Sequence, residues 1–209
     1  MPLIFQDKKD KFSFAVWQIT EDLSFFLDKI DLFKSEQKEI EELKEKRLME
    51  WLTSRYLVYL LENTGQRSAC IKDKYGKPYL YNSKKKISLS HSGIYVAASI
   101  SDFSTGIDIQ MVSGKINKIK NKFLSKTELE VCDDDIIKLN RYWTAKEALY
   151  KAYGKKGLNF IDDISVIPFV EQKTYLKSTG AVFKNKNTFD YNIYSRNIQE
   201  SILTIAIEK

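Results

Sequence analysis

The chain has 209 residues, 43% of them hydrophobic and 13% aromatic, which is enough apolar material for one large or two small packed domains. Its longest purely apolar run, Tyr56 to Leu61, is far shorter than the roughly 20 residues of a membrane span. Residues 1–11 lack the basic and apolar regions of a signal peptide, so we expect a cytoplasmic protein. The net charge of +6 favours an acidic partner, which charge alone does not identify.

The N-terminal half mixes strand and helix signals. Residues 12–19 read as a strand, and residues 35–63 as a helical region that Gly65 ends. Within the helical region, residues recur at near-helical spacing: Leu43, Arg47, Trp51, Arg55 and Val58. After a turn at Tyr75–Pro78, three further segments are predicted as strands: residues 87–91, 95–100 and 106–110.

The C-terminal half repeats this alternation. Helices are expected at residues 125–132 and 135–153, the second ending at Gly154. Four strands follow, at residues 163–167, 180–183, 190–195 and 201–207. The pattern predicts an α+β fold of two similar halves, residues 1–105 and 106–209, each with a small, mostly antiparallel sheet packed on helices. The cysteines, Cys70 and Cys132, lack metal-ligand spacing, and we expect buried or reduced thiols.

Three oxygen-bearing side chains are candidate ligands of a hard cation. Asp108 and Gln110 stand two apart on a predicted strand and therefore share a face. Glu147, on the long helix, is a third candidate, and oxygen donors suit magnesium. Structural alternatives stay open: Asp108 in a turn after Gly106, or Glu147 in a capping box with Thr144.

Glu147 also stands four residues before Lys151, a spacing that permits an ion pair on an exposed helix. The same spacing places Trp143, Glu147 and Lys151 on one helical face. That combination suits the wall of an active site, with glutamate for a metal or proton and lysine for a phosphate.

His91 is the single histidine of the chain and lies between Ser90 and Ser92. A serine hydrolase is disfavoured because the Gly-x-Ser-x-Gly elbow is missing. A structural histidine is the default interpretation, and a phosphate contact is the better functional one. Arg47 and Arg55 lie on nearly the same side of their helix, and the planar guanidinium suits phosphate.

Five segments occur together in one order: Gly76-Lys77-Pro78, Ile87 to Ser92, Gly106 to Ile109, Phe123 to Glu128, and Trp143 to Ala148 with Lys151, Gly154, Gly157 and Leu158. In this order they resemble the surfactin-synthetase-type 4'-phosphopantetheinyl transferases. The resemblance covers roughly residues 30 to 167, and its last block is the most specific.

The resemblance implies two pseudo-symmetric halves with coenzyme A in the cleft between them. It implies catalytic roles for Asp108, Glu147 and Lys151, with magnesium (or manganese) held by Asp108, Gln110 and Glu147. Arg47, Lys77, Ser90 and His91 would hold the adenosine and phosphate end of coenzyme A, and Lys151 a phosphate near the reacting centre. The partner would be an apo acyl or peptidyl carrier protein, contacted near residues 111–127. No nucleic acid or membrane partner is implied, and the enzyme would be a monomer.

Gln110 departs from the family pattern, because many members have a carboxylate there. The loss of one negative charge leads us to expect weaker metal binding or a water at that position. Two rival functions stay open on the residues alone. One is a magnesium-dependent nuclease, which leaves the Gly-Lys-Pro and Ser-His-Ser segments unexplained. The other is a module that binds coenzyme A or a carrier protein without catalysis.

Overall fold

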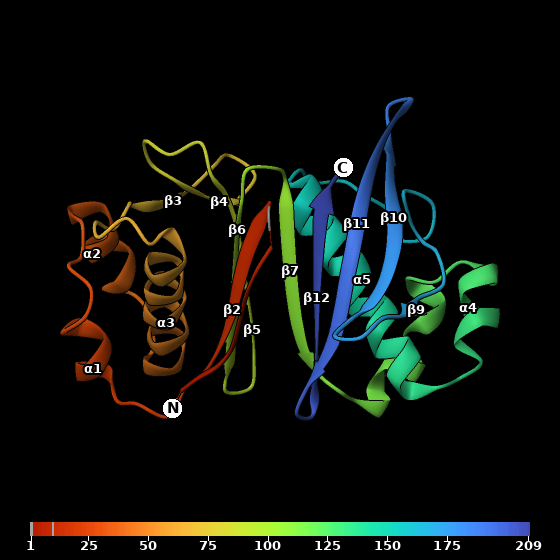
Figure 1. Ribbon diagram of the computed structural model, residues 1–209, viewed down its shortest axis with the longest axis horizontal. Helices are drawn as coiled ribbons and strands as arrows, with labels where there is room; N and C mark the ends of the chain where they lie inside the picture. The colour runs from red at the N-terminus through yellow and green to blue at the C-terminus, as the bar shows by residue number, and fades with distance from the viewer. Residues whose placement is uncertain (1, 10) are drawn as a thin grey trace. The chain divides into compact units, whose positions relative to one another are not determined.

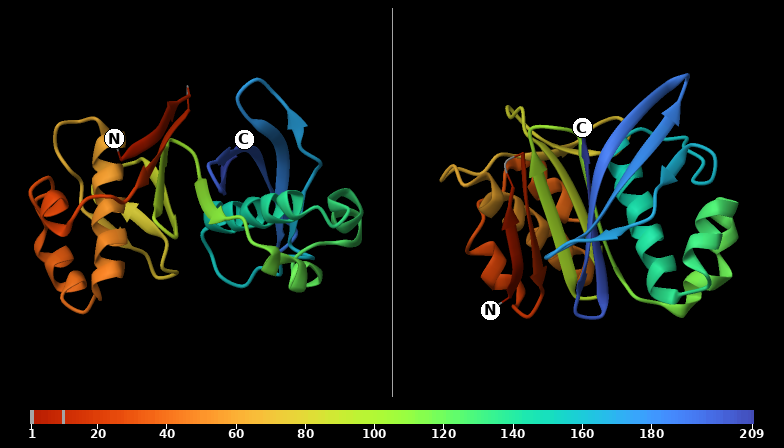
Figure 2. Two further views of the ribbon diagram at one scale, coloured as in Figure 1. Left: turned by 90° about the horizontal axis from the view of Figure 1, so that it is seen from below. Right: turned by 45° about the vertical axis from the view of Figure 1, so that its right-hand side comes forward.

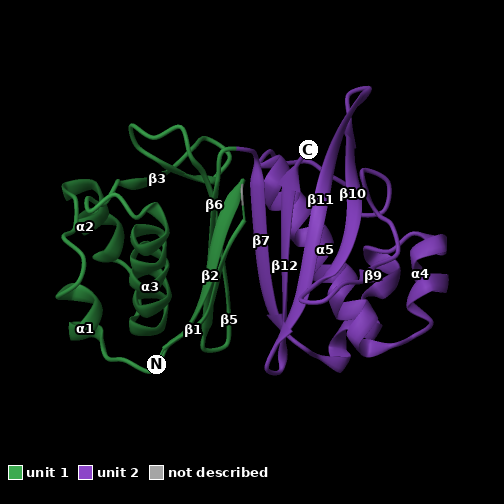
Figure 3. Cartoon of the chain, in the orientation of Figure 1, with its two compact units in different colours: residues 1–102 green, residues 103–209 purple. Residues whose placement is uncertain are grey.

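The computed structural model describes residues 2–9 and 11–209, so Met1 and Asp10 of the N-terminal segment lie outside the description. The chain divides into two compact units, residues 1–102 and 103–209 (Figure 3). Each unit pairs an antiparallel sheet with helices. The predicted α+β class with two similar halves is confirmed.

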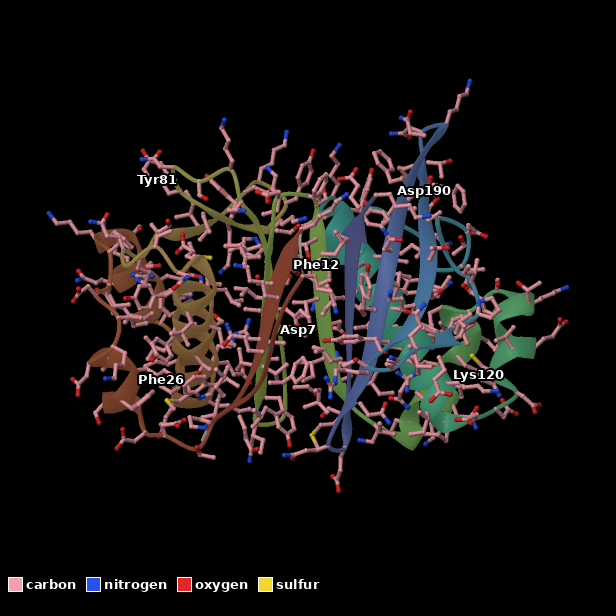
Figure 4. All side chains as sticks on the ribbon, in the orientation of Figure 1. Asp7, Phe12, Phe26, Tyr81, Lys120 and Asp190 are labelled. Atoms are coloured by element: carbon pink, nitrogen blue, oxygen red, sulfur yellow. The ribbon has the colours of Figure 1, made fainter. Side chains whose placement is uncertain are left out.

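In unit 1 the described residues form a six-stranded sheet in the order β1-β2-β6-β5-β4-β3. Its strands are β1 (Leu3–Lys8), β2 (Phe12–Gln18), β3 (Cys70–Lys72), β4 (Pro78–Leu80), β5 (Lys86–Ser92) and β6 (Tyr95–Ser101). The long helix α3 (Glu45–Glu62) packs on β2, β5 and β6 (Figure 1). Helix α1 (Leu23–Leu27) adds Phe26, labelled in Figure 4, which is fully buried in the core between helix and sheet.

The predicted helical region 35–63 contains two helices with a break between them. Helix α2 (Lys34–Ile40) ends before residues 41–44, and α3 begins after them. Helix α3 ends at Asn63, which has a left-handed φ of 50° and donates its N–H to Tyr59 O, rather than at Gly65. Asparagine adopts this conformation more readily than most residues, so it caps the helix in place of the glycine.

In unit 2 six strands of the described chain form a sheet in the order β7-β12-β11-β10-β8, with β9 pairing β10. Its strands are β7 (Thr105–Met111), β8 (Ile164–Val166), β9 (Val170–Glu171), β10 (Leu176–Lys184), β11 (Asn187–Ile198) and β12 (Ser201–Glu208). Helix α5 (Ile136–Tyr153) lies along one face of this sheet (Figures 1 and 2). The shorter helices are α4 (Lys126–Cys132), η1 (Gly114–Lys118) and η2 (Lys120–Lys122).

Local signals fix both ends of α5. Asp135 caps its start by accepting from the N–H groups of Ile137 and Lys138 at 2.7 and 3.0 Å. Gly154 ends it at a φ of 73°, where its N–H donates to Tyr150 O. The predicted helix over residues 135–153 is confirmed.

Helix α5 lies unusually close to strand β7 at Gly106. A Cβ at that position would stand 1.9 Å from Ala148 O and 2.6 Å from Ala152 N. Real Cβ atoms essentially never approach backbone atoms so closely, so only glycine allows this separation. The small side chains of Ala148 and Ala152 complete the close packing.

Cys70 and Cys132 are buried free thiols, as expected. Across the described residues, no helix combines the length and apolar character that crossing a membrane requires.

Replacing Gly106 with alanine should destabilise the protein strongly. The methyl group cannot fit without separating α5 from β7, and we expect a loss of roughly 3 kcal/mol or more in the free energy of unfolding, at the upper end of overpacking effects. Urea denaturation measures this change. The matched control is Gly114→Ala, where a Cβ meets nothing within 4 Å, and an equal loss in both variants would contradict the close-contact interpretation.

Candidate active site

Strand β7 carries Asp108, a buried carboxylate that is 1% exposed. Its Oδ1 accepts from Lys151 Nζ at 2.7 Å, and the same Nζ donates to Ile107 O at 3.1 Å. A buried carboxylate requires such compensation, because burial alone disfavours its charge. Asp108 therefore faces α5 and is joined to the helix by an ion pair.

Helix α5 places Glu147 one turn before Lys151, partly shielded from solvent. The pKa of Glu147 is raised to about 7, chiefly by burial and then by repulsion from Asp108, while the charge of Lys151 opposes both. Two carboxylates and one lysine therefore share one electrostatic environment, in which negative charge is in excess.

Both structural alternatives for Glu147 are wrong. Thr144 lies inside α5 rather than at its start, and its hydroxyl donates to Arg141 O at 3.0 Å and meets Thr204 Oγ1 at 2.8 Å. It is therefore no N-cap for Glu147. Within the described chain, Lys151 forms its ion pair with Asp108 across two elements, and not with Glu147 along the helix surface. The turn expected as an alternative for Asp108 is replaced by regular strand.

Gln110 is the third candidate donor and stands two residues beyond Asp108 on β7, where it is partly exposed. The period of a strand sends both side chains to the same face. Among the residues that the structure describes, no three His, Cys, Asp or Glu side chains gather as a metal-binding group. The candidate set is instead two carboxylates and one carboxamide.

This donor set fits a hard divalent cation. All three candidate atoms are oxygens, the ligand type that magnesium and manganese prefer. The repulsion between Asp108 and Glu147 that raises the glutamate pKa is the interaction that a cation would remove. The residues present therefore suit a magnesium site.

Aromatic rings cover the same side of α5. The ring of Trp143 lies 5.0 Å from that of Phe123 and 5.7 Å from that of Phe160, and Phe160 also stacks on Tyr150 at 5.7 Å. Trp143 and Tyr150 stand four residues before and three after Glu147, so they share its side of the helix. This apolar cover agrees with burial being the largest cause of the raised pKa of Glu147.

Lys146 is fully buried, which the sequence pattern did not predict for a lysine. It is 0% exposed, and its Nζ donates to Glu128 Oε2 at 2.7 Å, Phe160 O at 2.7 Å and Ile164 O at 2.9 Å. Glu128 in turn accepts from the N–H groups of Ser125 and Val166 at 2.8 and 3.1 Å. This network fixes the chain around Phe160 against α5. In the sequence, the Ser-x-x-Glu capping pattern at residues 125–128 is the feature that indicates part of this network.

In unit 1 the structure brings Arg47 and His91 together. Arg47 Nη1 contacts His91 Nε2, and the carboxylate of Glu50 lies 3.0 Å from Arg47 Nη1 and 3.3 Å from His91 Nδ1. Ser90 is adjacent to His91 on β5, so the two side chains point to opposite faces, with Ser90 buried and His91 exposed. Lys77 immediately precedes β4 and donates its N–H to Asp73 Oδ1 at 3.0 Å.

Arg55 does not share the exposed position of Arg47. It is 4% exposed, stacks over the ring of Trp51 at 4.1 Å, donates to Ser54 Oγ at 3.0 Å and lies 3.7 Å from Glu39. Its charge therefore serves the packing of α3 against α2, and the expected pairing of the two arginines toward phosphate is not seen.

Comparison with known proteins decides the family. Residues 104–206 match the family model described as "4'-phosphopantetheinyl transferase superfamily". A 4'-phosphopantetheinyl transferase named gsp, from Aneurinibacillus migulanus, is 30% identical over 113 residues, which are 52% of this chain and 47% of that protein. This segment of the chain therefore belongs to the 4'-phosphopantetheinyl transferase superfamily.

The superfamily match contains the three groups around the buried ion pair, Asp108, Glu147 and Lys151, and also Gln110. Arg47, Lys77, Ser90 and His91 precede the matched segment. The chain spans about half the length of the curated relative that it matches. The family expected from the motifs is confirmed, whereas the roles of individual residues remain proposals.

The metal-free protein should lose stability as pH rises between about 4.5 and 7. The pKa of Glu147 is raised from 4.5 to about 7 in the folded state, so folding favours the protonated form. This contribution is present below pH 4.5 and is lost as pH approaches 7. Urea denaturation across this range measures it. A Glu147→Gln variant should show a flatter profile, and profiles that run parallel would contradict the assignment.

Proposed function

We propose that this protein is a magnesium-dependent 4'-phosphopantetheinyl transferase that acts on coenzyme A and the serine of an apo acyl or peptidyl carrier protein. The observation that supports this most is the pairing of Asp108 with Lys151 beside the raised-pKa carboxyl of Glu147, within the segment that matches the superfamily. Two carboxylates beside a lysine suit a divalent cation, and the cation and the lysine together suit the negative charge of a pyrophosphate.

The reaction would proceed by attack of the carrier serine oxygen on the β-phosphorus of coenzyme A. The bond from this phosphorus to the oxygen bridging both phosphates breaks, and 3',5'-ADP leaves. The serine proton passes to an acceptor, and the carboxylate of Glu147, one turn before Lys151 on α5, is this chain's candidate. Lys151 would stabilise the negative charge of the transferring group.

Asp108, Gln110 and Glu147 would hold the divalent cation, magnesium or manganese. When bound, it would neutralise charge on the pyrophosphate and so favour attack at phosphorus. Lys151 at present compensates Asp108, and a cation at the carboxylates would leave the ammonium group available to a phosphate oxygen.

The remaining binding residues divide between the two partners. Arg47 and His91, with Lys77 and Ser90, would hold the adenosine and phosphate end of coenzyme A. Residues 111–127 would contact the carrier, and they carry lysines but no acidic residue: Lys115, Lys118, Lys120, Lys122 and Lys126. Lys120, labelled in Figure 4, already pairs with Asp134. A basic segment complements an acidic carrier and would steer its approach.

The direct test is to incubate the protein with coenzyme A, magnesium and apo carrier proteins of several classes, and to weigh the carriers by mass spectrometry. A gain of one phosphopantetheine that EDTA prevents is expected. Binding of coenzyme A without any gain on any carrier would instead favour a non-catalytic binding module.

Replacing either carboxylate should abolish transfer. Asp108→Ala and Glu147→Ala each remove a proposed metal donor, and we expect the rate to fall at least roughly 100-fold. The rate of holo-carrier formation measures this, with thermal unfolding to show that the variants are folded. Glu130→Ala removes an exposed carboxylate of α4 and serves as the control. Near-normal rates in either site variant would rule out the metal assignment.

Restoring a carboxylate at residue 110 should strengthen metal binding. In Gln110→Glu an added negative charge attracts the cation, so half-maximal transfer should need less magnesium, by roughly tenfold if the glutamate becomes a ligand. A magnesium titration of the transfer rate measures the change. An unchanged magnesium requirement would show that residue 110 does not face the metal.

A further inference from the structure

We propose that Glu50, a residue that neither the motifs nor the superfamily match singles out, positions Arg47, directly and through the ring of His91, for the 3'-phosphate monoester of coenzyme A. The inference rests on the proposed function, since it concerns the nucleotide end of the same substrate. Glu50 touches the two binding residues rather than the reacting atoms, so its role is positioning.

Glu50 lies beneath the two exposed side chains that it contacts. It is 8% exposed, whereas the side chains of Arg47 and His91 are 57% and 41% exposed. Arg47 stands three residues before Glu50 on α3, and His91 comes from β5. One buried carboxylate therefore ties a helix residue to a strand residue 44 positions away in sequence.

The contacts define the state of the imidazole. Arginine has only N–H donors, so His91 Nε2, which Arg47 contacts, must be the accepting nitrogen. The proton of the neutral ring then lies on Nδ1, which faces Glu50 Oε2 at 3.3 Å. Glu50 thus orients the ring as well as the guanidinium, and directs Nε2 to the position that Arg47 occupies.

A phosphate monoester is the anion that this arrangement suits. The pyrophosphate would be served by the cation and Lys151, which leaves the dianionic 3'-phosphate of coenzyme A as the remaining concentrated charge. A guanidinium held by a carboxylate loses less conformational freedom when it binds phosphate, and it keeps its geometry. Without Glu50 the two exposed side chains would have to be ordered by the ligand itself.

The test compares the binding of coenzyme A with that of dephospho-coenzyme A, which lacks the 3'-phosphate, by isothermal titration calorimetry. The wild type should bind coenzyme A more tightly. Glu50→Gln should weaken binding of coenzyme A roughly tenfold, the effect expected on losing charged hydrogen bonds. Its binding of dephospho-coenzyme A should change less than about twofold, because that ligand does not use the positioned pair.

Two further variants separate positioning from a structural effect. Glu45→Gln, an exposed residue in the first turn of the same helix, should leave both affinities unchanged. In an Arg47→Gln background, Glu50→Gln should add little, because the residue that it positions is already missing.

Each contrary outcome has a distinct meaning. Equal weakening of both ligands, with a lower unfolding temperature, would show that Glu50 is structural only. Full retention of the preference for coenzyme A in Glu50→Gln would also overturn the inference, while leaving the transferase proposal intact. Absence of binding of either ligand to the wild type would overturn both.

Discussion

The close approach of α5 to β7 at Gly106 is the constraint on which the site depends. Because glycine has no side chain, the backbone of the helix at Ala148 lies where a Cβ would otherwise be. Asp108 follows two residues later on the strand, and Glu147 adjoins Ala148 on the helix. The contact therefore sets the separation at which Lys151 Nζ reaches both Asp108 Oδ1 and Ile107 O. A larger separation would leave the buried carboxylate without its cation, at a considerable cost in stability.

The charge balance around this contact explains why the site suits phosphate chemistry. One lysine offsets Asp108, while Glu147 keeps a raised pKa because burial and its neighbour both disfavour ionisation. Lys146, the residue before Glu147, has the opposite role: its charge is paired with Glu128 and used to hold neighbouring backbone. Of these adjacent residues of one helix, Lys146 therefore serves the structure, whereas Glu147 is the one proposed for the chemistry.

The sequence predicted those features that depend on local patterns. Helix α5 was predictable because Asp135 and Gly154 mark its ends, and the longer strands were predictable from their alternation and turn residues. The break between α2 and α3 was not, because residues 41–44 are compatible with a continuous helix. The end of the helical region near residue 63 was predicted, but its cap was expected at Gly65 rather than at Asn63, because glycine is the more usual capping residue.

The sequence did not predict the ion pairs between residues that lie far apart in the chain. Lys146 and Arg55 have the composition of surface residues, and their burial is compensated by groups far along the chain, such as Glu128 and Glu39. The partner of Lys151 was likewise expected at Glu147 as one alternative, because helical spacing is visible and the contact with β7 is not. Glu50 was missed for the same reason, since its link to His91 joins two elements.

The central claim is that Asp108 and Glu147 hold a divalent cation beside Lys151. A crystal structure with coenzyme A and manganese, in which the metal is located by its anomalous scattering, tests this most directly. The account predicts a manganese peak in contact with both carboxylates and with the pyrophosphate, and a Lys151 ammonium group that binds phosphate. Coenzyme A bound with no manganese at these carboxylates, and with the Lys151–Asp108 ion pair intact, would contradict it.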